Sequence, residues 1–291
     1  MVRYFSTVGQ PDAVAVEEKM TRLAFVVLIS MLVMSAPGGW TQQAVAKSPP
    51  PIRTGPLRLE KMNYSKADGS CKGNPCVEIK IDSLRVISAP SVQAGERINA
   101  AIDTWVRHGE DSQPPARNPQ EVLQRFVDSY WKASREESKA DQAYAIPWYQ
   151  NRIVGLEFQS EHVLSLSFQE GGFTGGAHPY GELTYMNFRP ATGARIHMAD
   201  IFKEGYIKPL NAVAERRFRE LKQISPQARL GVAYPAFADG FRLNQNFSIG
   251  GRGLTFFFND YEIAAYVEGP TRLFVPYAEI RSLLRPDANI P

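Results

Sequence analysis

Short segments in which every second residue is apolar are the feature that most limits the fold of this chain. Leu164, Leu166 and Phe168 alternate with serines, which is the pattern of a strand with one buried face. Residues 77–81 repeat this alternation. Weaker signals of the same kind predict strands at 153–158, 183–188, 247–249, 254–258 and 273–275. The chain therefore has to build at least one sheet.

Apolar residues spaced by three and four positions predict helices between these strands. They occur near residues 98–106, 122–130 and 207–221, and a short closing helix is predicted at 277–284. The second helix has Asn118 as its predicted N-cap, Pro119 in its first turn and Glu121 in a capping-box-like position. Helices and strands do not alternate strictly. The predicted fold class is therefore α+β, with two strand-rich regions, mixed or antiparallel sheets, and packing helices.

The N-terminus reads as an export signal. Residues 23–36 carry no charge, and this run is shorter than the roughly 20 residues that cross a bilayer. The triplet 44–46 (Ala-Val-Ala) suits signal peptidase, so we predict that residues 1–46 are removed and that the protein is periplasmic or secreted. A start at Met20 would give a signal without the acidic residues that precede it. If the run stays uncleaved, the protein is a membrane-tethered sensor instead.

The two cysteines fit an exported protein. Cys71 and Cys76 enclose a turn-forming tetrapeptide, and we predict a disulfide between them. In the chain-entropy model so small a loop adds only about 2 kcal/mol to stability. A structural zinc site needs four ligands, and a thioredoxin-like motif needs a two-residue spacing, so both are disfavoured.

No catalytic or metal-binding motif stands out. The chain has four histidines, none of them at metal-ligand spacing: His108, His162, His178 and His197. No serine lies in a nucleophile-elbow motif. We therefore assign no catalytic residue, no metal and no cofactor. A formal net charge of +3 also gives no reason to expect a nucleic-acid partner.

One glycine-rich segment, residues 171–180, carries side chains suited to binding. Gly175 and Gly176 allow positive φ and close approach of another group, while His178 and Tyr180 offer hydrogen bonds and ring faces. The competing interpretation is a tight connection between strands where only glycine fits, and it is the favoured one.

The same segment carries a family resemblance. Residues 173–178 (Phe-Thr-Gly-Gly-Ala-His), 187–188, 192–193 and 200–202, followed by 261–263 (Tyr-Glu-Ile) and 276–277 (Pro-Tyr), resemble an extracytoplasmic domain family. That family is found at the C-terminal end of the anti-sigma factor RsiV and beside the catalytic domain of the peptidoglycan deacetylase PdaC. The upstream part, about 77–168, is similar to the companion domain that precedes it in those proteins.

The resemblance sets the expected domain organisation. We assign a flexible lead-in at 47–70, a PdaC-type α+β domain at 71–170 and an RsiV C-terminal-like α+β domain at 171–291. The candidate binding residues are those of the glycine-rich segment and the downstream motifs: Gly175, Gly176, His178, Tyr180, Tyr261, Glu262 and Tyr277.

The resemblance implies a non-catalytic binding module of the cell envelope, whose partner is a lysozyme-like protein or peptidoglycan. No segment here resembles a polysaccharide deacetylase, so the metal site of that enzyme is not carried over. The alternative from a different class is a hydrolase acting on cell-wall or other glycans. Its dispersed catalytic residues would be His178, Tyr180, Asp260 and Glu262.

Overall fold

The computed structural model describes residues 56–70, 75–108, 114–137 and 146–291. The predicted signal peptide, the alternative start at Met20 and Cys71 lie outside these residues, so cleavage and the Cys71–Cys76 disulfide stay predictions. The described residues belong to one compact unit. Within the described part, no helix has the length and apolarity that a membrane span requires.

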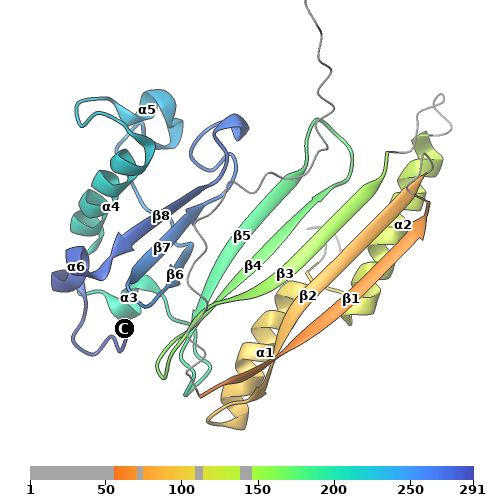
Figure 1. Cartoon of the computed structure of the whole chain (residues 1–291), viewed down its shortest axis with the longest axis horizontal. Coiled ribbons are helices and arrows are strands. Elements are labelled where there is room, and N and C mark those ends of the chain that lie inside the picture. The colour runs from red at the N-terminus through yellow and green to blue at the C-terminus, as the bar shows by residue number, and fades with distance from the viewer. Residues whose placement is uncertain (1–55, 71–74, 109–113, 138–145) are drawn as a thin grey trace, which may run out of the picture. The chain divides into compact units, whose positions relative to one another are not determined.

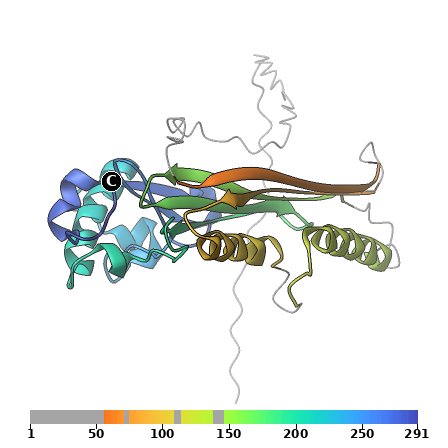
Figure 2. The same ribbon diagram turned by 90° about the horizontal axis from the view of Figure 1, so that it is seen from below.

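A five-stranded mixed sheet makes up the first region (Figure 1). Its strands lie in chain order: β1 (Arg58–Gly69), β2 (Cys76–Ser88), β3 (Trp148–Gln159), β4 (Leu164–Phe173) and β5 (Tyr180–Phe188). Only β2 and β3 are parallel, and a parallel pair needs a crossover connection. Here α1 (Val92–Val106) and α2 (Pro119–Glu137) make that crossover, and both lie on the same face of the sheet (Figure 2).

The strand β1 corrects the sequence analysis. Residues 58–69 were assigned to the flexible lead-in, but they pair with β2 along their whole length. The interpretation failed because β1 is an edge strand with one neighbour, so no position in it is fully buried. An edge strand rich in charged residues shows no apolar alternation, and the charges themselves protect the edge from unwanted pairing.

A β-bulge explains the irregular apolar spacing in β3. The register between β3 and β4 shifts between Leu156 and Phe158. An extra residue at this point breaks the strict alternation that the rest of the strand keeps. This strand was predicted from residues 153–158 alone, whereas it begins at Trp148.

The second region is built on a three-stranded antiparallel sheet. Its strands are β6 (Phe247–Ile249), β7 (Gly253–Phe258) and β8 (Thr271–Pro276). The helices are α3 (Met198–Ile201), α4 (Ile207–Lys222), α5 (Leu230–Ala233) and α6 (Tyr277–Ile280), with 3-10 turns η1 (Pro235–Phe237), η2 (Tyr266–Glu268) and η3 (Arg281–Leu283). One mixed and one antiparallel sheet with packing helices confirm the α+β prediction.

Two asparagine side chains, the buried Asn187 and the half-buried Asn246, join the two regions. Asn187 of β5 donates to the Phe247 carbonyl at 2.7 Å and accepts from the Ile249 amide at 3.0 Å. The Ser165 hydroxyl of β4 lies 2.7 Å from Asn187 Oδ1 and 2.7 Å from the Ile249 carbonyl oxygen, and its single hydrogen donates to one of these two acceptors. Asn246 likewise donates to the Leu183 carbonyl at 2.6 Å. The domain boundary expected at residues 170/171 falls inside β4.

Candidate functional site

The five-stranded sheet carries a groove of about 1050 Å³ on its helix side. On β2, the helix-facing residues Ile79 and Ile81 are fully buried. On β5, Thr184 and Met186 are only half-buried, and Glu182 is exposed. The helices therefore seal one part of this face and leave the β5 side open, which places the groove between α1, α2 and strands β3 to β5.

Strand alternation puts a row of charged residues across the floor. Arg152 of β3 lies opposite Glu170 of β4, and Glu170 lies opposite Glu182 of β5. Farther along the strands, Phe168 lies opposite Thr184, and its ring meets Trp105 of α1 edge-to-face at 5.4 Å. The floor is thus charged in its middle and aromatic beside it.

Arg152 has the largest number of polar partners among these charged residues. It is 6% exposed, and its Nε lies 3.0 Å from Glu170 Oε2. Its Nη1 donates to the carbonyls of Val106 at 3.0 Å and His108 at 2.6 Å. Both carbonyls lie at the C-terminal end of α1, where backbone carbonyls have no hydrogen-bond partner within the helix. A single arginine therefore ties the end of α1 to the sheet and holds Glu170 in place.

Glu170 has a pKa above its usual range. Burial is the largest cause, and the neighbouring Glu182 raises the pKa further, while Arg152 and His108 act in the opposite direction. Gln150 donates to Glu170 Oε1 at 2.8 Å and to the Tyr180 hydroxyl at 2.9 Å. This links the predicted binding residue Tyr180 to the floor of the groove.

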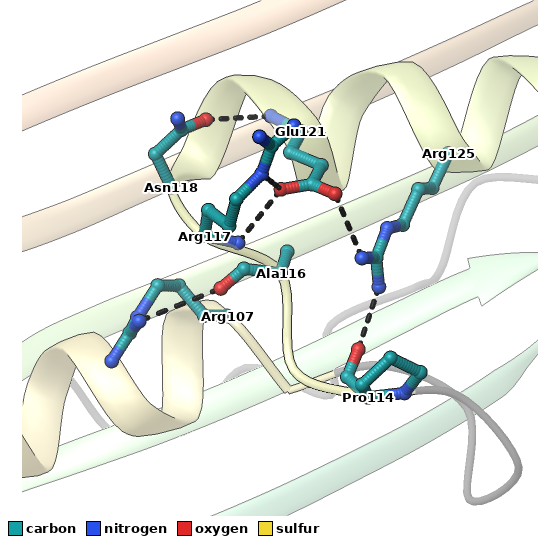
Figure 3. A network of polar contacts seen from close by, with 7 residues as sticks. All are labelled: Arg107, Pro114, Ala116, Arg117, Asn118, Glu121 and Arg125. Atoms are coloured by element: carbon teal, nitrogen blue, oxygen red, sulfur yellow. Dashed lines mark hydrogen bonds and ion pairs between the residues drawn. The ribbon is translucent and has the colours of Figure 1, made fainter.

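Hydrogen bonds from Arg107 and Arg125 to residues 114–121 fix the helix wall of the groove (Figure 3). Arg125 donates to Glu121 Oε1 at 2.8 Å and to the Pro114 carbonyl at 2.6 Å. Arg107 donates to the Ala116 carbonyl at 3.5 Å. Both arginines line the groove, and these bonds hold the chain around them in one arrangement.

The start of α2 follows the predicted capping closely. Asn118 Oδ1 accepts from the Glu121 amide at 2.9 Å, so the predicted N-cap is confirmed. Glu121 Oε2 accepts from the amide and from Nε of Arg117, both at 2.8 Å, one residue before the position that a capping box uses. Hydrogen bonds from Arg117 and Arg125 lower the pKa of Glu121 to about 2.

Two charged residues of the groove wall have no such partner. Among the described residues, no group forms a hydrogen bond or ion pair with the carboxylate of Glu182 or the guanidinium of Arg195. Arg195 lies over the ring of Phe188, 5.3 Å from its centroid. These charges are open to a ligand.

Some of the predicted binding residues meet at a different place. His178 Nε2 lies 2.9 Å from the Tyr261 hydroxyl, and the His178 ring stacks on Tyr266 at 3.8 Å. Tyr261 is 63% exposed and has φ 63°, a conformation that bulky residues rarely adopt. Burial raises the pKa of the adjacent Asp260.

The remaining predicted residues have structural surroundings. Glu262 accepts from Asn244 at 2.7 Å and from the Asn259 amide at 2.8 Å, which braces the turn after β7. Tyr277 is 6% exposed and donates to the Gly250 carbonyl at 2.9 Å.

The predicted glycines form the turn between β4 and β5. Gly175 and Gly176 have φ of 94° and 95°, a region that favours glycine. Gly172, by contrast, belongs to β4, where a Cβ would lie 2.3 Å from the Tyr149 carbonyl oxygen. The backbone geometry thus accounts for the glycines of this segment without a ligand.

Sequence reasoning missed most of the groove, including Trp105, Arg152, Glu170, Glu182 and Arg195. One signal was present: Glu170 continues the alternation of Leu164, Leu166 and Phe168, so a charged residue occupies a helix-facing position. The described residues contain no group of three or more side chains suited to hold a metal ion.

Comparisons with known proteins place the chain among related folds. The sequence profile described as deacetylase PdaC matches residues 70–180, and that of a family of proteins of unknown function, DUF3298, matches residues 199–278. The chain combines a PdaC-like and a DUF3298-like region. This confirms the family resemblance drawn from the motifs at 173–202 and 261–277. No curated protein matches the chain.

Two crystal structures of DUF3298-family proteins share the fold. One, from Bacteroides fragilis, is 20% identical with a TM-score of 0.66, over 80% of this chain and 95% of the other. The second, from Pseudomonas aeruginosa, is 16% identical with a TM-score of 0.61, over 81% and 98%. At these identities the likeness extends to the fold alone.

Proposed function

We propose that this protein is a non-catalytic, exported binding module of the cell envelope, and that the groove beside α1 and α2 holds its ligand. The observation that carries the proposal is the groove itself: a concave site of about 1050 Å³ with aromatic and hydrogen-bonding walls. Ligand sites in proteins are concave, have volumes of about 300–1,000 Å³ and combine such walls with a few polar groups. The predicted signal peptide and the PdaC-like region support an envelope location.

Peptidoglycan fragments suit this groove better than a whole lysozyme-like protein. Four arginines and two glutamates line it: Arg107, Arg125, Arg152, Arg195, Glu170 and Glu182. That excess of positive charge favours an anionic ligand, and wall fragments carry carboxylates. A folded protein needs an interface of about 1,200 Å² or more, which a groove of this size does not supply by itself.

The hydrolase alternative draws little support from the residues expected to carry it. The carboxylate of Glu262 is committed to Asn244 and to the Asn259 amide. Tyr180 borders the groove, whereas His178 contacts Tyr261 and Tyr266. Asp260 lies close enough to His178 for that ring to lower the pKa of its carboxyl against the effect of burial, but Tyr180 and Glu262 have other partners, so the four expected residues do not share one set of contacts.

The test is calorimetric titration of the protein with soluble peptidoglycan fragments and, separately, with a lysozyme. The groove is blocked by Thr184→Trp, because Thr184 is a half-buried floor residue without a side-chain hydrogen bond to lose among the described contacts. Asn151→Trp is the matched control, since it adds the same side chain at an exposed strand position outside the groove.

We expect fragments to bind the wild type and the control and to lose at least tenfold in affinity for Thr184→Trp. Lysozyme binding that is insensitive to Thr184→Trp would place a protein partner elsewhere and contradict the groove as its site. If neither titrant binds the wild type, the proposed function falls.

A further inference from the structure

The unpaired charges of the groove lie at opposite ends of its β5 wall. Glu182 is near the start of β5, and Phe188 is at its end. Arg195 continues the sheet there, because it forms a bridge with Phe188. Six residues of strand span about 20 Å. The Cα atoms of Glu182 and Arg195 therefore lie about that far apart, with a free carboxylate at one end of the wall and a free guanidinium at the other.

Apolar and hydrogen-bonding groups fill the space between these two charges. Met186 provides apolar surface, and Thr184 lies between Glu182 and Met186 on the same face of β5. The other charges of the groove have partners within the protein: Glu170 pairs with Arg152, Arg125 pairs with Glu121, and Arg107 donates to the carbonyls of Asp103 and Ala116.

We propose that the groove binds a short extended peptide with free ends, its amino group at Glu182 and its carboxylate at Arg195. This rests on the proposed function, in which the groove is the ligand site, and adds the class and direction of the ligand. An extended chain of about six residues spans the distance. Charge complementarity selects the occupant: a neutral saccharide or a purely anionic ligand leaves Glu182 without a partner.

Opposite charges at the two ends also fix the orientation. A peptide bound in reverse would place its amino group at Arg195 and its carboxylate at Glu182, and like charges facing each other penalise that arrangement. The side chains of the peptide would face the apolar stretch around Met186. Its backbone amides would face Thr184.

The experiment uses one hexapeptide of alanine, serine and valine in four forms: free ends, N-acetylated, C-amidated, and blocked at both ends. Each form is titrated into the wild type and into Glu182→Gln and Arg195→Gln. Arg252→Gln is the control, because Arg252 is exposed in a turn outside the groove. Thr184→Trp tests whether the binding occurs in the groove.

We expect acetylation and amidation each to weaken binding to the wild type by about tenfold or more, as for the loss of one charge-assisted hydrogen bond. Arg195→Gln should lose sensitivity to amidation but keep sensitivity to acetylation, and Glu182→Gln the reverse. Equal binding of the blocked and free peptides, or no binding of any form, overturns the inference. If peptidoglycan fragments still bind in a manner sensitive to Thr184→Trp, the proposed function stands and only the peptide assignment falls.

Discussion

The two sheets of this protein pack against cores of different composition. The core on the helix side of the five-stranded sheet is mainly aliphatic, with Ile79, Ile81, Ile98 and Ile102 packed between sheet and helices. The core around the three-stranded sheet is rich in aromatic rings, with Phe218, Phe237, Phe256 and Phe258 among its buried members. The aliphatic core opens into the groove at its β5 side, whereas the aromatic core belongs to a region whose residues do not line that groove.

This difference separates stability from binding. Two helices laid along a five-stranded sheet cannot cover every strand, so a concave strip remains beside them. In the second region, large rings fill the space around a smaller sheet. The groove is thus a product of incomplete coverage, and changes in the aromatic core should affect folding without affecting the binding surface directly.

The largest effect on the free energy of unfolding is expected when one aromatic ring is removed from each core. Phe218 is 0% exposed and has ring neighbours at 4.9 Å and 5.4 Å, Tyr234 and Phe237. Phe218→Ala should lower the free energy of unfolding by about 3–5 kcal/mol, because the closed core cannot collapse into the cavity. Phe168→Ala should cost less, because its cavity joins the groove and water can enter. Urea unfolding measures both, and an equal or larger cost at Phe168 would contradict the contrast between closed and open cores.

The next effect concerns the bonds that join the regions. Asn187→Ala removes the donor to the Phe247 carbonyl and the acceptor for the Ile249 amide, both buried. Unsatisfied buried groups cost about 1–3 kcal/mol each, so we expect a loss of about 2–3 kcal/mol in urea unfolding. The control is Asn63→Ala, an exposed asparagine that donates to Asp82 at 2.6 Å; it should cost less than about 0.5 kcal/mol. Similar losses for the two variants would mean that Asn187 does not couple the sheets.

The sequence predicted the elements of the second region better than the site. Strands β6, β7 and β8 and helix α4 follow from local periodicity, which a single sequence displays. The edge strand β1 does not show this periodicity. It has a neighbouring strand along one edge only, and its residues are exposed or half-buried.

The groove depends on pairing that the sequence does not display. Arg152, Glu170 and Glu182 are far apart in the chain and meet only because β3, β4 and β5 align in one register. The local motifs that drew attention instead, Gly175 to Tyr180, form a turn and an adjacent cluster with Tyr261 and Tyr266. Of the residues from Gly175 to Tyr180, only Tyr180 also lines the groove.

The smallest effect distinguishes two glutamates of the first region by their response to pH. Glu121 has a pKa of about 2 in the folded protein against an ordinary value of 4.5, so its stabilising contribution is present above pH 4.5 and is lost as the pH falls toward 2. Glu170 has a raised pKa, so its contribution is present below its ordinary pKa and is lost as the pH rises through the folded value.

The measurement is urea unfolding of the wild type, Glu121→Gln and Glu170→Gln between about pH 3 and pH 7. The stability advantage of the wild type over Glu121→Gln should shrink as the pH is lowered, because protonation removes the bonds from Arg117 and Arg125. Its advantage over Glu170→Gln should instead grow, since the wild-type carboxyl becomes neutral and no longer bears the cost of a buried charge beside Glu182. A slope of the same sign for both variants would show that the ion pair with Arg152 outweighs burial and lowers the pKa of Glu170. No slope for Glu170→Gln would show that Glu170 is solvated like a surface residue.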